Sequence, residues 1–253
     1  MKELIYRIAD LITLGKGVKT SISGFSLRLP TRYYKYFEPD YELNNINFLN
    51  NYLKPGMVVI DVGAHIGLLS SIIAQKVGNA GKVYAFEPTP STFGLLQKTI
   101  AINNQTDVIV PIRKAVSDKS GATTFYITDR PAQNSNSLSD YKRGNSEEYG
   151  IDVELVSIDD FIETNKLSRI DLLKIDAEGA ELSVLKGAVT TIDRYKPRIL
   201  LGLHPYAIAS FGDTLSAIWD FIVSKNYKIY YKSEEVTKEF FVKQKDLFDV
   251  FLL

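Results

Sequence analysis

Two glycines four residues apart mark the stretch of the chain best suited to hold a ligand. An apolar run, MVVI, ends at Asp61, and a turn with Gly63, Ala64, His65 and Gly67 follows it. A buried strand that enters a helix through this turn is expected, because glycine allows backbone angles that other residues avoid. A carboxylate beside the turn repels a pyrophosphate and attracts a cation such as an ammonium or a sulfonium. The pattern therefore predicts a site for a positively charged ligand.

Further reactive side chains follow other strand-like runs. Glu87 lies about 20 residues beyond the turn, where a carboxylate typically accepts hydrogen bonds from both ribose hydroxyls of a nucleotide. Asp176 and Glu178 follow an apolar run, and His204 ends another. Because the carboxyl ends of parallel strands meet at one edge of a sheet, these side chains are predicted to share a rim.

The chain has two histidines, His65 and His204, and each follows a predicted core strand. Imidazole has an unperturbed pKa near 6.5, so it can accept a proton near neutral pH. His204 is the preferred candidate for taking a proton from a substrate hydroxyl, with a hydrogen-bonded structural histidine as the alternative. His65, inside the turn, is expected to support the loop.

Strand and helix patterns alternate along the central part of the chain. This alternation predicts an α/β fold with a doubly wound, mostly parallel sheet. The expected core strands end at Asp61, Glu87, Ile112, Asp176 and His204. Two helices are expected at about 68–77 and 91–103, and a later helix at 214–224 is followed by strands at 227–231, 240–242 and 247–253.

The first 54 residues are predicted to form an extension, and residues 55–253 a Rossmann-like domain. The segment 1–14 carries apolar residues on one helical face and indicates an amphipathic helix that packs on the main body, with a membrane-surface or dimer contact as the alternative. An aromatic-rich stretch, a short hairpin and a helix at about 41–53 complete the extension. The polar loop 128–150 is long, which favours a substrate lid or a disordered segment.

Composition excludes several classes of protein. The 253 residues include 30 basic and 30 acidic ones, so no overall charge favours nucleic acid. No apolar run approaches the roughly 20 residues of a membrane span. The absence of cysteine excludes disulfides and thiolate metal sites. We expect a cytoplasmic protein, with peripheral membrane contact through residues 1–14 as an option and the oligomeric state open.

Four motifs occur together and in order: DVGAHIG from Asp61, FEP from Phe86, AVSD from Ala115 and KIDAEGAE from Lys174. With them the chain resembles the FkbM family of S-adenosylmethionine-dependent methyltransferases over roughly residues 40–205. The resemblance implies a class I methyltransferase fold, with seven strands of which the last is antiparallel. It also implies O-methylation of a hydroxyl, often on a sugar or a natural product. His65 stands where the family usually has asparagine.

The resemblance also assigns roles to residues. Asp61 and the glycine turn would hold the methionine end of the cofactor, and Glu87 would hold the ribose. The adenine would be bordered by Val116, Ser117 and Asp118. Asp176 and Glu178 would lie beside the methyl group, where they could orient the acceptor, act as base or bind a Mg²⁺ that acidifies the hydroxyl. A helix-start cap and a loop support are the structural alternative for this pair.

Two rival functions remain at this stage. A nicotinamide-dependent dehydrogenase uses a similar sheet, but its third glycine is missing here. A non-catalytic ligand-binding relative would keep the fold without the chemistry. We expect a small-molecule or glycan hydroxyl as acceptor, since tyrosine rings near residues 33–52 suit a sugar, and we expect no nucleic acid partner.

Overall fold

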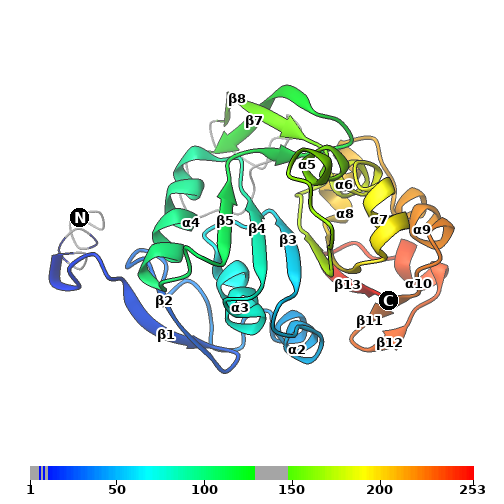
Figure 1. Cartoon of the computed structure of the whole chain (residues 1–253). Helices are drawn as coiled ribbons and strands as arrows, with labels where there is room; N and C mark the ends of the chain where they lie inside the picture. Colours follow the sequence, from blue (N-terminus) through cyan, green and yellow to red (C-terminus); the bar gives the residue numbers. More distant parts are fainter. Residues whose placement is uncertain (1–5, 7, 9–10, 129–147) are drawn as a thin grey trace.

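A mixed eight-stranded sheet forms the centre of the molecule (Figure 1). The computed structural model describes residues 6, 8, 11–128 and 148–253. The strand order is β12-β11-β13-β10-β9-β3-β4-β5. The strands are β3 (Val58–Val62), β4 (Lys82–Phe86), β5 (Ile109–Ile112), β9 (Leu172–Ile175), β10 (Arg198–Leu203), β11 (Ile229–Tyr231), β12 (Glu234–Glu235) and β13 (Phe248–Leu252).

The topology confirms the predicted doubly wound sheet. Strands β5, β4, β3, β9 and β10 are parallel neighbours, and β13 inserts antiparallel between β10 and β11. The chain runs outward from β3 to β5 and then returns to place β9 on the other side of β3. The strand order therefore reverses between β3 and β9, which is where ligands bind in such sheets. The two-residue edge strand β12 adds to the seven strands expected.

Helices cover both faces of the sheet, and each face buries its own apolar cluster. Alternate residues of β3 point to opposite faces, with Val59 in one cluster and Ile60 in the other. One face is covered by α2 (Leu43–Tyr52), α3 (Leu68–Val77) and α4 (Pro90–Ile102). The other carries α5 (Ile158–Thr164), α6 (Glu181–Lys186), α7 (Val189–Tyr195), α8 (Pro205–Ser210), α9 (Leu215–Ser224) and α10 (Lys238–Val242).

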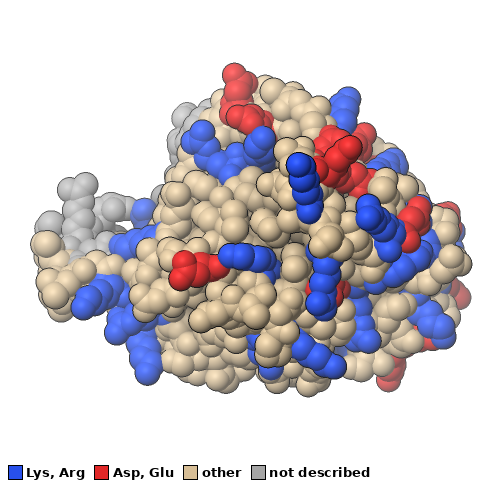
Figure 2. Space-filling model, viewed as in Figure 1, with Lys and Arg blue, Asp and Glu red and all other residues tan. Residues whose placement is uncertain are grey.

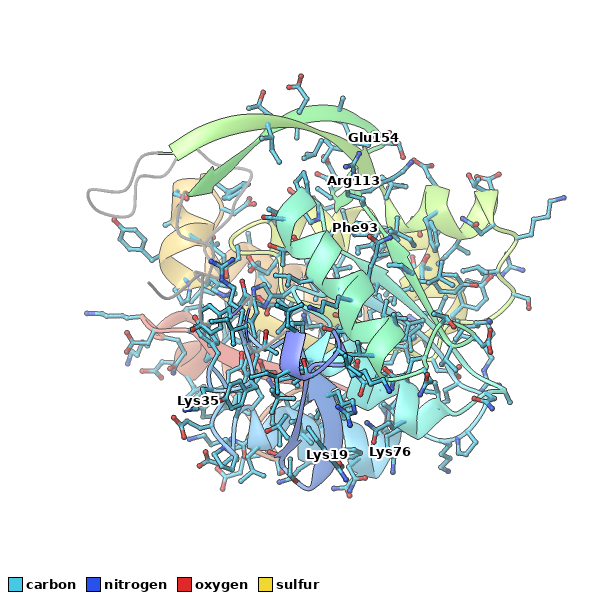
Figure 3. The ribbon with its side chains drawn as sticks, turned by 90° about the vertical axis from the view of Figure 1, so that its left-hand side faces the viewer. Lys19, Lys35, Lys76, Phe93, Arg113 and Glu154 are labelled. Atoms are coloured by element: carbon cyan, nitrogen blue, oxygen red, sulfur yellow. The ribbon has the colours of Figure 1, made fainter. Side chains whose placement is uncertain are left out.

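A small second sheet, β6-β8-β7, lies beyond the end of β5, at the top of Figure 1. Its strands are β6 (Ala115–Val116), β7 (Gly121–Thr128) and β8 (Glu148–Val156). Lys114 Nζ lies 2.9 Å from Glu154 Oε2 of β8, and Figure 3 shows Glu154 and Arg113 at the same end of the molecule. The predicted lid within 128–150 falls mostly outside the described residues.

The N-terminal extension packs directly on the sheet face that α3 covers. Its hairpin consists of β1 (Val18–Ile22) and β2 (Phe25–Leu29), and α2 agrees with the helix expected near 41–53. Leu29 and Leu49 are completely buried in the same cluster as α3. Lys and Arg side chains gather near the hairpin, at the lower left of Figure 2, whereas both signs are mixed elsewhere on this view.

The predicted amphipathic helix at 1–14 lies largely outside the described residues, so its membrane or dimer contact stays a prediction. Among the residues that the structure describes, no helix combines the length and the apolar character needed to cross a membrane.

The run at 240–242 was predicted as a strand, and this is wrong: it belongs to helix α10. Thr237 caps this helix through its hydroxyl, which accepts a hydrogen bond from the backbone N–H of Phe240. Phe241 is fully buried against Trp219 and Phe248. A short apolar run fits a buried strand and a buried helix turn equally well, so its pattern alone could not decide between them.

A buried lysine joins the two strands at the reversal point. Lys174 of β9 is paired in register with Asp61 of β3, and its Nζ lies 3.2 Å from Asp61 Oδ1. The same Nζ donates a hydrogen bond to the carbonyl of Gly63 at 2.9 Å. Asp61 is completely buried and also accepts a hydrogen bond from Ser70 at the start of α3. These contacts fix β9, β3 and the glycine turn together.

The turn also needs a glycine at position 63 for steric reasons. Gly63 has φ of +74°, and a Cβ placed on it would lie 2.0 Å from the carbonyl oxygen of Asp176. The backbone N–H groups of Gly63 and Ala64 donate to the carbonyl of Phe86 at 3.0 and 2.9 Å. The turn is therefore held closely between the ends of β4 and β9.

Gly63→Ala should lower the free energy of unfolding by at least about 2 kcal/mol, since it combines a left-handed backbone with a clash against the main chain. Gly56→Ala is the matched control, because Gly56 has φ of +83° and open space around its Cβ position. Urea unfolding of both variants measures the difference. Equal losses in the two variants would show that the close approach to β9 costs nothing.

Lys174→Met should destabilise the protein by about 3–5 kcal/mol, because it leaves Asp61 buried without its cation. Adding Asp61→Asn to that variant should recover part of the loss, since no uncompensated carboxylate then remains. A double-mutant cycle by urea unfolding gives the coupling energy. Strictly additive effects of the two substitutions would contradict the pairing.

Candidate active site

The ends of four neighbouring strands bring the predicted site residues to one rim. The glycine turn follows β3, Glu87 follows β4, Asp176 follows β9 and His204 follows β10. Asp176 Oδ2 lies 3.7 Å from Lys174 Nζ, and Asp176 Oδ1 lies 3.5 Å from His204 Nε2. The juxtaposition expected from the strand order is therefore present.

Glu87 links the glycine turn to the segment after β4. Its Oε2 accepts a hydrogen bond from the backbone N–H of His65 at 3.1 Å, and its Oε1 accepts one from the N–H of Thr89 at 3.0 Å. The Thr89 side chain also hydrogen-bonds this carboxylate, so about one of its four acceptor positions is left for a ligand hydroxyl. Burial raises the pKa of Glu87 to about 7, against these hydrogen bonds, which lower it. The predicted ribose contact is compatible with this geometry.

His65 is a neutral side chain in the turn. Burial, together with the charge of Lys174, lowers the pKa of His65 to about 4. Its backbone is left-handed, with φ of +51°, and its ring meets the ring of Tyr33 edge-on at 6.5 Å between centroids. These contacts agree with the predicted role as a support of the loop.

The Asp61 side chain lies behind the glycine turn and is completely buried. It neutralises Lys174 and accepts a hydrogen bond from Ser70, so it fixes the position of the turn. The contact of Asp61 with the methionine end of a cofactor stays a prediction.

Gly67 lies where two helices approach each other. It is the left-handed N-cap residue of α3, with φ of +85°. A Cβ at this position would lie 2.6 Å from Leu96 Cδ1 of α4. The bare backbone therefore allows the contact between α3 and α4, and the contact of Gly67 with a cofactor stays a prediction.

The segment predicted to border adenine forms β6 and the turn after it. Val116 is buried in the core cluster under the second sheet, and Ser117 is also buried. Asp118 is exposed. Of the three side chains, the Asp118 carboxylate is thus the one that solvent reaches, and the adenine contact stays a prediction.

Asp176, Glu178 and His204 form a compact cluster at the ends of β9 and β10. His204 Nε2 lies 3.5 Å from Asp176 Oδ1 and 3.7 Å from Glu178 Oε1. Its other nitrogen, Nδ1, lies 3.0 Å from Oε1 of Glu181, which is completely buried. Glu178 has a left-handed backbone with φ of +49°, which turns the chain sharply between β9 and α6.

The groups around His204 set its protonation state. Burial alone would lower the pKa of His204, but the hydrogen bond that its ring donates to Glu181 and the charges of Asp176 and Glu178 raise it to about 9. Both ring nitrogens face carboxylates, so the ring carries two protons near neutral pH. An imidazolium has no lone pair to accept a proton, so the role of His204 as a general base stays a prediction that requires the neutral ring.

Four residues of the site went unassigned in the sequence analysis: Lys174, Glu181, Tyr41 and Glu42. Lys174 and Glu181 belong to the quoted KIDAEGAE motif, and a lysine within an apolar strand was a usable signal. Burial raises the pKa of Glu42 to about 7, beside Lys174, Asp176 and Asp249. Tyr41 is hydrogen-bonded to Glu42. Glu42 comes from the extension, and no pattern in the sequence pointed to it.

Comparison with known proteins agrees with this site. The family described as "Methyltransferase FkbM domain" matches residues 61–229. Methyltransferase sdnD of Sordaria araneosa is 33% identical over 154 residues, which is 51% of this chain and 59% of that protein. The hexuronic acid methyltransferase AglP of Haloferax volcanii is 26% identical over 197 residues, covering 74% of this chain and 77% of AglP. The match thus spans about three fifths of sdnD and about three quarters of AglP.

A crystal structure of methyltransferase FkbM from Methylobacillus flagellatus KT shares the fold, with a TM-score of 0.51 and 16% sequence identity. The similarity covers 100% of this chain and 60% of that one. This likeness supports the class I architecture. Because the family match extends over residues 61–229, about two thirds of the sequence, the chain belongs to the FkbM family of methyltransferases.

Proposed function

We propose that this protein transfers a methyl group from S-adenosylmethionine to a hydroxyl of a small sugar or a glycan. The observation that carries the proposal is the shared rim of the glycine turn, Glu87 and Asp176 within an FkbM-family chain. When bound, the cofactor supplies a methyl group on a positively charged sulfur. The acceptor oxygen forms the new O–C bond, the C–S bond breaks, and the hydroxyl proton leaves.

The charges at the rim suit a cationic donor. Lys174 and His204 are the two basic groups inside the cluster, and the carboxylates that contact them outnumber them: Asp61, Asp176, Glu178 and Glu181. Such an excess of negative charge favours a positive ligand over the neutral thioether product. Asp176, whose side chain is 39% exposed, is the carboxylate placed to meet it.

Asp176 and Glu178 are also the groups that could act on the acceptor. The Glu178 side chain is 17% exposed and lies 3.7 Å from His204 Nε2. Because His204 is cationic in this cluster, these carboxylates replace it as the candidates that hold the acceptor hydroxyl and receive its proton. They would do so directly or through a divalent cation such as the Mg²⁺ considered from the sequence.

A sugar acid is the acceptor class that we favour. The relative AglP, which matches 74% of this chain, is a hexuronic acid methyltransferase by name. Tyr41 and Glu42 of the extension lie near Asp176, and a tyrosine ring with a carboxylate suits the faces and hydroxyls of a sugar. The predicted cytoplasmic location is retained as part of this proposal.

Glu87→Gln should weaken binding of S-adenosylhomocysteine at least tenfold, as expected for a lost charged hydrogen-bond acceptor. The pKa of Glu87 is raised to about 7 in the free protein, and ribose hydroxyls donate best to the ionised form. Affinity of the unmodified protein should therefore be full above that pH and fall as the pH drops below it. Calorimetric titration at several pH values measures this, and a Glu87→Gln protein with the same pH slope as wild type would refute it.

Asp176→Asn should reduce methyl transfer to a hexuronate acceptor at least about 100-fold, as for loss of a proton-accepting group. Binding of S-adenosylhomocysteine should weaken much less, because the turn and Glu87 remain. Transfer of labelled methyl groups, with and without EDTA, gives the rates. Asp220→Asn, an exposed carboxylate on α9, is the control. Activity that survives both EDTA and Asp176→Asn would eliminate this carboxylate from the chemistry.

A further inference from the structure

The cluster at the ends of β9 and β10 offers three donor atoms of two kinds. One oxygen of Asp176, one oxygen of Glu178 and one nitrogen of His204 all lie within 4.8 Å of one another. Ligands that share one ion at about 2.0–2.2 Å lie roughly 3–3.5 Å apart. The measured Nε2–oxygen distances of 3.5 and 3.7 Å are therefore close to those of a filled site and long for hydrogen bonds.

The orientation of His204 is a second and independent indication. Its side chain is about nine-tenths buried, with 10% exposed. Nδ1 is held at 3.0 Å by the buried carboxylate of Glu181, which leaves Nε2 directed at Asp176 and Glu178. Within the described part of the chain, Nε2 makes no hydrogen bond. A carboxylate that fixes one imidazole nitrogen while the other is turned to a ligand is the arrangement around metal-binding histidines.

Asp176 provides a third indication. Its Oδ1 is buried and has no hydrogen-bond partner among the described residues, although the rest of the side chain is partly exposed. This is the same oxygen that faces His204 Nε2. In the free protein the protonated His204 ring supplies the positive charge beside this oxygen, at a distance long for a hydrogen bond, and an ion between the two would contact both atoms.

We propose that Asp176, Glu178 and His204 bind one divalent transition-metal ion of the Mn²⁺ type, with Glu181 as a positioning residue. The imidazole ligand sets the expected preference, because Mg²⁺ binds oxygen ligands almost exclusively whereas Mn²⁺, Co²⁺ and Zn²⁺ accept nitrogen. The inference deepens the proposed function: an ion there would coordinate the acceptor hydroxyl and lower its pKa, and the released proton would pass to water.

Titration of the full chain with Mn²⁺, followed by the loss of the free-ion EPR signal, tests the site without any turnover. One ion per chain is expected. Asp176→Asn and His204→Asn should each weaken binding at least tenfold, and Glu181→Gln about 10–100-fold, as for other groups that orient a metal ligand. Asp220→Asn should bind as wild type. Circular dichroism confirms that each variant is folded, and Glu178→Gln supplies a further ligand variant if one is not.

His204→Asp gives a sharper readout, since it replaces the nitrogen ligand with oxygen. The ratio of Mn²⁺ to Mg²⁺ affinity should fall at least tenfold in this variant, which a purely structural role of His204 does not predict. Absent binding at millimolar Mn²⁺, or binding unchanged in Asp176→Asn and His204→Asn, would overturn the inference. Calorimetry with S-adenosylhomocysteine separates the two proposals: thioether binding without Mn²⁺ binding defeats only the metal site, and the reverse result defeats only the proposed function.

Discussion

The candidate site depends on one buried ammonium group. Lys174 lies in the middle of the sheet, where its charge would be very costly without partners, and it meets the completely buried Asp61 across the strand pair. The same ammonium group donates to the carbonyls of Val62 and Gly63, so it holds the main chain of the glycine turn as well. The glycine turn then positions the backbone N–H of His65 to donate a hydrogen bond to Glu87. A single charge therefore sets the positions of three strand ends.

The second basic group, His204, organises the acidic residues on the other side of the reversal point. Glu181, which is buried, fixes one nitrogen, and the other faces the two carboxylates that follow β9. Without a cation, Asp176, Glu178 and Glu181 would repel one another within a few ångströms. The protonated ring satisfies this need in the free protein, and a metal ion in contact with the neutral ring would satisfy it equally. The acidic cluster is thus built to retain a positive charge.

Sequence patterns predicted the parallel core strands, the glycine turn and the rim. Apolar runs that end in carboxylates or glycine and alternate with helix patterns are typical of the core strands of an α/β sheet. They could not predict what the buried carboxylates contact. Asp61 and Glu87 follow their strands in the same way and both are buried, yet Asp61 pairs with Lys174 whereas Glu87 accepts from the backbone N–H of His65 in the turn. That difference arises from Lys174 on a strand more than 100 residues away, and the contribution of Glu42 arises from the extension. Long-range pairing of this kind leaves no local signal in the sequence. The apolar run at 240–242 likewise did not show whether it forms a helix or a strand.

Asp176 joins the two halves of the site. Its backbone N–H donates to the carbonyl of Val62, and its own carbonyl lies against Gly63, so the end of β9 is joined directly to the start of the glycine turn. The two oxygens of its side chain face different basic groups: Oδ2 faces Lys174 and Oδ1 faces His204. Methyl transfer requires the acceptor oxygen to lie in line behind the methyl group, and a small misplacement costs much of the rate. Asp176 is fixed to the glycine turn by its main chain, and its Oδ1 is directed toward His204, on the side proposed for the acceptor. Asp176 would therefore link the position of the methyl donor to that of the acceptor without a separate hinge. This coupling supports the proposal that the chemistry takes place at the strand-order reversal.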